Sequence, residues 1–192
     1  MVVLGLPRGG IPVAHEVAKA LTAPLDVFVV RKLGAPLQPE LAMGAIASGG
    51  VRVLNAEVIR ILDIPQETIE QVTRREQQEL ERRERAYRDG RPRVALANHQ
   101  VILVDDGLAT GSTMRAAVAA VRDLHPSRVI VAVPVGAPET CRELATIADE
   151  VVCVEMPVPL EAVGTWYRDF SQTTDDEVRD ALRPTVTPGG DG

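Results

Sequence analysis

The chain has 192 residues, of which 45% are hydrophobic and 25% are charged, a composition typical of a soluble globular protein with one core. Its formal net charge of −6 at pH 7 argues against broad binding to nucleic acid. No segment reaches the apolar length of a membrane span, and the N-terminus lacks the pattern of a signal peptide. We therefore expect a cytoplasmic protein that binds neither membranes nor nucleic acid.

The cysteines and histidines do not indicate a metal site or a disulfide. Cys141 and Cys153 lack the spacing of metal ligands, and we expect both to be reduced thiols. The three histidines are scattered along the chain, so a zinc site built on histidine is not expected.

The chain opens with two apolar strands and a helix between them. We predict the strands over 2–6 and 25–30, and the helix begins near Pro12. Residues 33–41 are rich in glycine and proline, which favours a loop.

A hairpin and two helices are predicted next. Strands over 41–47 and 51–54 flank a turn of serine and two glycines, and helical patterns follow over about 55–62 and 66–89. The second helix is heavily charged and is interpreted as a solvated helix; a partner-binding arm or a mobile lid is the functional alternative. Its glutamate–arginine pairs at i,i+4 spacing are Glu79 with Arg83, Glu81 with Arg85, and Glu84 with Arg88.

The second half alternates strands with helices, which predicts an α/β fold with a Rossmann-like parallel sheet and helices on both faces. We expect a single domain over 1–182 and a flexible tail over 183–192. The predicted strands are 101–104, 128–135 and 151–154, and the predicted helices are 112–124 and 138–147.

The segment VILVDDGLATGSTM, residues 101–114, carries the clearest chemistry. A buried apolar strand runs directly into Asp105 and Asp106, and a loop of small residues then leads into a helix. The first N–H groups of that helix lack intrahelical partners and lie at the positive end of its dipole, so they attract an anion. The loop residues that would form this anion site are Gly107, Leu108, Ala109, Thr110, Gly111, Ser112 and Thr113.

The two carboxylates would repel a phosphate, so we expect them to face something else. Sugar hydroxyls can donate to Asp105 and Asp106, and a hydrated Mg²⁺ can lie nearby, bound to them indirectly. A 5-phosphorylated ribose offers both a phosphate and hydroxyls at about this separation. An ordinary strand–turn–helix with acidic turn residues is the alternative, but this order of residues makes it the weaker interpretation.

The stretch DDGLATGST resembles the phosphoribosyl pyrophosphate (PRPP) motif of the type I phosphoribosyltransferases, especially the adenine-type enzymes. The resemblance implies the type I fold and a Mg²⁺-dependent pentosyltransferase activity, with PRPP as donor and a small molecule as acceptor. It also implies a homodimer. It extends over about residues 1–170 and is specific at 5–10, 31–32 and 101–114.

Two other segments match positions at which the resembling family binds pyrophosphate. Arg8, Gly9 and Gly10 follow the first strand, where glycines free the backbone N–H groups and an arginine adds a charged fork. Arg31 and Lys32 follow the second strand, where a basic residue assists in the family. A structural turn at LPRGG and a solvated strand end at Arg31-Lys32 are the alternatives.

The resemblance also implies a small C-terminal hood over the base, here about residues 156–182. Within AVGTWYRDF, Val163 and Gly164 precede an aromatic cluster, as in purine-using members. Trp166 or Tyr167 would then stack on a base and Asp169 would accept from its N–H or amino group. The alternative is that the aromatic residues only pack the hood onto the core.

One position departs from the hypoxanthine/guanine-type pattern, in which an aspartate able to act as general base precedes the Thr-Gly of the motif. Here that position is Ala109. A base would have to come from elsewhere, and Glu40 is a candidate because the family's mobile catalytic loop lies in its region.

The leading hypothesis is a phosphoribosyltransferase that uses PRPP and a nitrogenous acceptor, in nucleotide metabolism, with Asp105, Asp106, Arg8 and Lys32 as its catalytic residues. A regulatory protein that senses PRPP or a nucleotide on the same fold is the second hypothesis. A hydrolase that uses the acidic pair with Mg²⁺ is the third, although it needs further carboxylates that the sequence does not identify. The acceptor is left open between purines, pyrimidines and other compounds.

Overall fold

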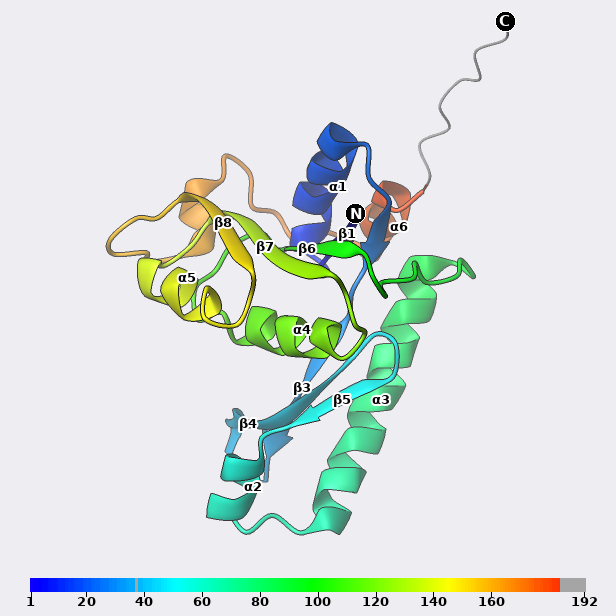
Figure 1. Cartoon of the computed structure of the whole chain (residues 1–192), viewed down its shortest axis with the longest axis vertical. Helices are drawn as coiled ribbons and strands as arrows, with labels where there is room; N and C mark the ends of the chain where they lie inside the picture. Colours follow the sequence, from blue (N-terminus) through cyan, green and yellow to red (C-terminus); the bar gives the residue numbers. More distant parts are fainter. Residues whose placement is uncertain (37, 184–192) are drawn as a thin grey trace, which may run out of the picture.

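Two sheets organise the chain (Figure 1). The computed structural model describes residues 1–36 and 38–183, apart from the side chain of Glu40, so most of the predicted flexible tail lies outside the described residues. The larger sheet has five parallel strands in the order β2-β1-β6-β7-β8. Their bounds are β1 Val2–Gly5, β2 Leu25–Val27, β6 Gln100–Val104, β7 Arg128–Val135 and β8 Glu150–Glu155.

Helices cover both faces of this sheet, as predicted (Figure 1). Side chains alternate between the faces of a strand, so Val3 and Ile102 pack against α1 (Gly10–Leu21). Their neighbours Leu4 and Leu103 belong to the opposite layer, with α4 (Ser112–Arg122) and α5 (Pro138–Leu144). The near-continuous apolar runs of the strands follow from this burial on two sides.

The predicted strand over 25–30 is wrong in one respect, because it splits between two sheets. β2 ends at Val27, and β3 (Val30–Ala35) belongs to a separate antiparallel sheet, with order β3-β4-β5. The chain crosses at Phe28 and Val29, both of which are buried. A continuous apolar run fits either arrangement, so the sequence pattern alone could not show the break.

The loop predicted over 33–41 is also wrong. Residues 33–35 belong to β3 and residues 38–41 to β4 (Gln38–Ala47), and the two strands pair antiparallel with a register shift on each side of Gly34. A side chain at Gly34 would collide with the backbone of Pro39, so the glycine allows the strands to approach at the irregularity. The predicted hairpin that follows is confirmed, with β4 joined to β5 (Val51–Leu54).

The charged helix is only partly solvated, which corrects the prediction. α2 (Ala56–Ile61) and α3 (Gln66–Arg88) form as expected, and the three glutamate–arginine pairs are present at 2.8, 3.9 and 3.8 Å. However, one face of α3 packs against β3 and buries Leu80 and Tyr87. Arg88 is also buried, and its Nη1 lies 2.7 Å from both carboxylate oxygens of Asp26 in β2. These buried contacts argue against a mobile lid.

The C-terminal segment adds two short helices that were not predicted, η1 (Val163–Trp166) and α6 (Asp175–Ala181). Thr174 and Glu177 cap α6 reciprocally, a T-x-x-E pattern that was available in the sequence. In Figure 1 this segment runs from the end of β8 past α1 to α6. No helix in residues 1–36 and 38–183 is both long enough and apolar enough to cross a membrane.

Candidate active site

The strand connections determine where a crevice opens. β1 leads into α1 on one face of the sheet, and its neighbour β6 leads into α4 on the other face. The loops at the carboxyl ends of these two strands therefore diverge, which is where parallel α/β sheets bind ligands. The sequence-predicted residues of loops 6–10 and 105–113 meet at this point.

The two loops touch closely because both Gly9 and Gly10 lack a side chain. A Cβ on Gly9 would overlap the carboxylate of Asp106, and a Cβ on Gly10 would lie 2.7 Å from the Val104 carbonyl oxygen. Gly9 has an ordinary φ of −60°, so the constraint is space rather than backbone conformation. The predicted pyrophosphate loop and acidic pair are thus brought into direct contact.

Burial perturbs both carboxyl groups of the acidic pair. Burial, and then the neighbouring charge of Asp106, raise the pKa of Asp105 to about 7, although the Asp106 N–H donates to its Oδ1 at 2.9 Å. Burial also raises the pKa of Asp106, opposed by the Gly107 N–H. The pair is therefore suited to accept from hydroxyl groups or to face a cation, either of which would favour the ionised forms.

The predicted phosphate loop joins the sheet at one end and α4 at the other. Leu108 is buried, its N–H donates to the Val135 carbonyl at 2.9 Å, and its own carbonyl accepts from Ala137 at 2.8 Å. Gly111 has a φ of +65° and precedes the first turn of α4. Thr110 and Thr113 are exposed and Ser112 is half-buried, so the N–H groups at the start of α4 lie at an accessible surface beside the Thr110 hydroxyl.

A cavity of about 430 Å³ lies between these loops and the hood segment, residues 156–182. It brings together the predicted residues Arg8, Gly9, Asp106, Tyr167 and Asp169. Residues that the sequence reasoning did not select also line it: Pro12, Val13, Phe170, Ser171, Gln172 and Thr173. Pro12 and Val13 belong to α1, whereas the contribution of residues 170–173 depends on the path of the chain after Asp169, which no local pattern indicates.

Tyr167 holds the hood segment against the acidic tip of β6. Its hydroxyl donates to the Asp106 carbonyl oxygen at 2.6 Å, and its ring lies 5.0 Å from that of Phe170. Burial, and then the charges of the acidic pair, raise the pKa of Tyr167 to about 12, so it stays a donor. Trp166 does not line this cavity; it is 49% exposed and borders a separate hollow beside Pro159.

The remaining predicted residues lie apart from the 430 Å³ cavity. Arg31 donates from Nε to the Glu76 carboxylate of α3 at 2.9 Å. Lys32 lines a groove of about 610 Å³ with Ser112 and Arg115, beside the start of α4. The backbone of Glu40 belongs to β4, while its side chain lies outside the described residues.

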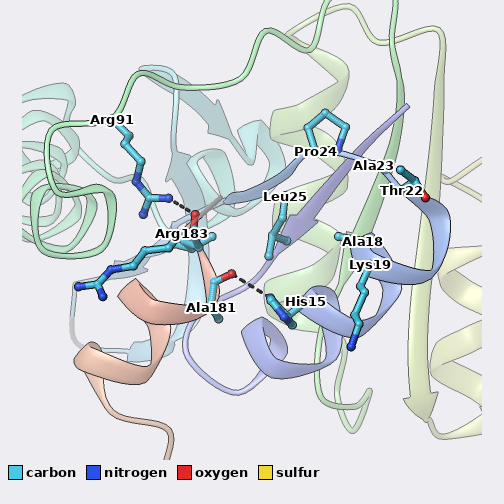
Figure 2. Close-up of a pocket in the computed structure, with 11 residues that line it drawn as sticks. His15, Ala18, Lys19, Thr22, Ala23, Pro24, Leu25, Arg91, Ala181 and Arg183 are labelled. Atoms are coloured by element: carbon cyan, nitrogen blue, oxygen red, sulfur yellow. Dashed lines mark hydrogen bonds between the residues drawn. The ribbon is translucent and has the colours of Figure 1, made fainter. Parts of the chain in front are cut away.

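Another cavity, of about 480 Å³, lies where α1 ends and β2 begins (Figure 2). It is lined by Lys19, Arg91 and Arg183, but Arg91 donates to carbonyls at the ends of α3 and α6. His15 Nδ1 lies 2.9 Å from the last carbonyl of α6. Figure 2 shows Lys19 and Arg183 pointing away from each other. These groups join α6 to α1 and α3 and do not converge on a ligand.

Comparison with known proteins agrees with this arrangement. Residues 40–168 match the family model described as the phosphoribosyl transferase domain. The chain belongs to the phosphoribosyltransferase family. The family predicted from the sequence is therefore confirmed.

Two relatives and one structure extend the comparison. The Mycobacterium tuberculosis proteins MT0597 and Rv0571c, which carry the provisional name phosphoribosyl transferase, are each 52% identical over 178 residues, or 93% of this chain. The chain spans only 40% of the length of these relatives. The crystal structure of TT1426 from Thermus thermophilus is 46% identical, with a TM-score of 0.87 over 94% of this chain and 86% of that one.

The crevice between β1 and β6 suits Mg²⁺ only together with a ligand that supplies phosphates. No group of three or more His, Cys, Asp or Glu side chains able to hold a metal occurs within residues 1–36 and 38–183, Glu40 aside. Mg²⁺ commonly binds one or two carboxylates, keeps several waters and takes its other ligands from substrate phosphates. Asp106, on the cavity wall beside the Gly9 loop, fits that mode of binding.

Replacing Asp105 by asparagine should change the pH dependence of stability. The folded-state pKa of about 7 exceeds the ordinary value of 3.8, so wild-type stability falls as pH rises between these values. Thermal unfolding should show Asp105→Asn close to wild type near pH 4 and more stable at pH 8. The control is Asp169→Asn: hydrogen bonds from Ser171 lower the pKa of Asp169 below the ordinary value of 3.8, so its contribution to stability is lost only at lower pH, and this variant's difference from wild type should stay nearly constant between pH 4 and pH 8. A pH-independent difference for Asp105→Asn would contradict the assignment.

The close approach of Gly9 to the Asp106 carboxylate can be tested by a rescue experiment. Gly9→Ala places a methyl group on the Asp106 carboxylate and should destabilise the protein by about 1–3 kcal/mol, as overpacking does. Adding Asp106→Ala removes the overlap, and the double variant should recover most of the loss in urea unfolding. Equal stability of Gly9→Ala and wild type would show that the loops are not in this contact.

Proposed function

We propose that this phosphoribosyltransferase-family chain transfers the 5-phosphoribosyl group from PRPP to a nitrogenous acceptor, with a nucleobase as the expected class, and releases pyrophosphate. The observation that carries the proposal is the contact between the Gly9–Gly10 loop and the acidic pair, next to an open phosphate loop. In this proposal, a pyrophosphate, a ribose and a phosphate monoester bind next to one another along the crevice between β1 and β6. The family match supports this donor.

Each part of PRPP has a proposed set of contacts. The 5-phosphate binds the loop from Thr110 to Thr113 at the start of α4. The ribose hydroxyls donate to Asp105 and Asp106. The pyrophosphate lies against the backbone of loop 8–10, where Arg8 adds its guanidinium.

Arg8 and Lys32 differ in their availability to the donor. Arg8 lies 3.5 Å from Asp175, in a partly exposed pair, and such pairs are weak enough to exchange for a phosphate. Lys32 borders Ser112, so its proposed contact is with the phosphate end of the donor. Arg31 would have to leave Glu76 to reach a ligand.

The acceptor is proposed to enter the 430 Å³ cavity, between Arg8 and the hood segment. Tyr167 and Phe170 offer apolar ring surface, and Asp169 and Gln172 offer polar groups for the edge of a base. Trp166 borders a different hollow and is left out of this contact set.

In the proposed reaction an acceptor nitrogen forms a bond to the anomeric carbon while the bond to pyrophosphate breaks and its oxygen keeps the electron pair. Arg8 and the loop N–H groups stabilise the leaving charge, and the ribose is held through its hydroxyls. When bound, Mg²⁺ would supply further charge neutralisation beside Asp106. Because Ala109 has no acid–base group, the acceptor proton passes to solvent or to another group.

The test is the double variant Asp105→Asn/Asp106→Asn, assayed for pyrophosphate release from PRPP with a panel of purine and pyrimidine bases. Turnover should fall by at least about a hundredfold, because hydroxyl contacts to two carboxylates are weakened together, while circular dichroism stays unchanged. Asp123→Asn, an exposed position after α4, is the matched control and should retain activity. Full activity in the double variant would overturn the assignment, and PRPP binding by wild type without turnover would favour the sensor hypothesis.

A further inference from the structure

The phosphate loop rests on α5, a helix outside the sequence motif. Thr140 of α5 is only 7% exposed, and its Oγ1 donates to the Ala109 carbonyl oxygen at 2.7 Å. Its methyl group lies where a side chain on Gly111 would be, so Thr140 also packs beneath the turn before α4. A single side chain thus contacts the loop at two nearby points.

The hydrogen bond to Ala109 fixes the direction of a whole peptide unit. In a trans peptide the carbonyl and the following N–H point in opposite directions. Holding the Ala109 carbonyl toward α5 therefore aims the Thr110 N–H away from α5, toward the open side of the loop, where both residues are exposed. An N–H group that already has the correct orientation can bind an anion without a further loss of conformational entropy.

A second contact links α5 to α4. Arg115, in the first turn of α4, donates from Nη1 to the Glu143 carboxylate of α5 at 3.0 Å. The backbone bonds of Leu108 to Val135 and Ala137 fix the other end of the loop. Thr140 lies between these two attachments and is the side chain that reaches the loop carbonyl.

We propose that Thr140 is a positioning residue for the phosphate monoester end of the donor. It holds the Ala109–Thr110 peptide in the orientation that receives the phosphate, and it does not touch the substrate itself. This inference rests on the proposed function, because it assigns the loop to the 5-phosphate of PRPP.

The experiment compares Thr140→Val with Thr140→Ser. The valine variant keeps the shape and loses the donor, whereas the serine variant keeps the donor and loses the methyl group. Ribose 5-phosphate and pyrophosphate with Mg²⁺ are titrated separately by calorimetry, because they probe the two loops independently. Thr140→Val should bind ribose 5-phosphate about tenfold more weakly, as expected for one lost hydrogen bond with an unpaired acceptor. Thr140→Ser should stay within about twofold of wild type, and pyrophosphate affinity should be unchanged in both.

Three results would overturn the inference: wild-type affinity in Thr140→Val, equal losses in the valine and serine variants, or a parallel loss of pyrophosphate binding. The second would indicate packing alone and the third a general loss of structure. If Thr140→Val does not fold, Thr140→Ala against Thr140→Ser supplies the same contrast. Failure of the wild type to bind either ligand would instead overturn the proposed function, and this inference with it.

Discussion

The site depends on one constraint, the contact between the loops that follow β1 and β6. These strands are neighbours, yet their chains leave on opposite faces of the sheet, so a crevice has to open between them. Gly9 and Gly10 then let the first loop approach the acidic tip of β6 until backbone and carboxylate touch. In the proposed function, this contact sets the positions of the pyrophosphate and the ribose relative to each other.

The same approach has an electrostatic consequence. Packing Asp105 and Asp106 under a neighbouring loop removes water from two like charges, and the pKa of Asp105 rises to about 7. An arrangement that disfavours its own ionised form gains from a ligand that donates hydrogen bonds or carries positive charge. Under the proposed function, binding of the donor and its cation would offset the energetic cost of burying the acidic pair, which supports a binding role over that of a structural turn.

Local patterns were enough to predict β1, β6, β7 and β8 of the parallel sheet, the hairpin of β4 and β5, and the loop from Asp105 to Gly111 that leads into α4. Two of the errors share a cause, since each depends on contacts distant in sequence. The apolar run 25–30 serves two sheets, and α3 buries Arg88 because Asp26 lies opposite it. Thr140 escaped notice for the same reason: only the fold brings it 2.7 Å from Ala109. The α6 cap, by contrast, was readable as T-x-x-E and was overlooked.

The most direct test of the PRPP site is calorimetric titration of PRPP into the protein with and without Mg²⁺. We predict micromolar affinity that depends on Mg²⁺, because Asp106 alone supplies too few ligands for the cation without the substrate's phosphates. Binding should also release protons near pH 7, as Asp105 becomes ionised. No binding by demonstrably folded protein would contradict the central claim that the crevice between β1 and β6 is a PRPP site.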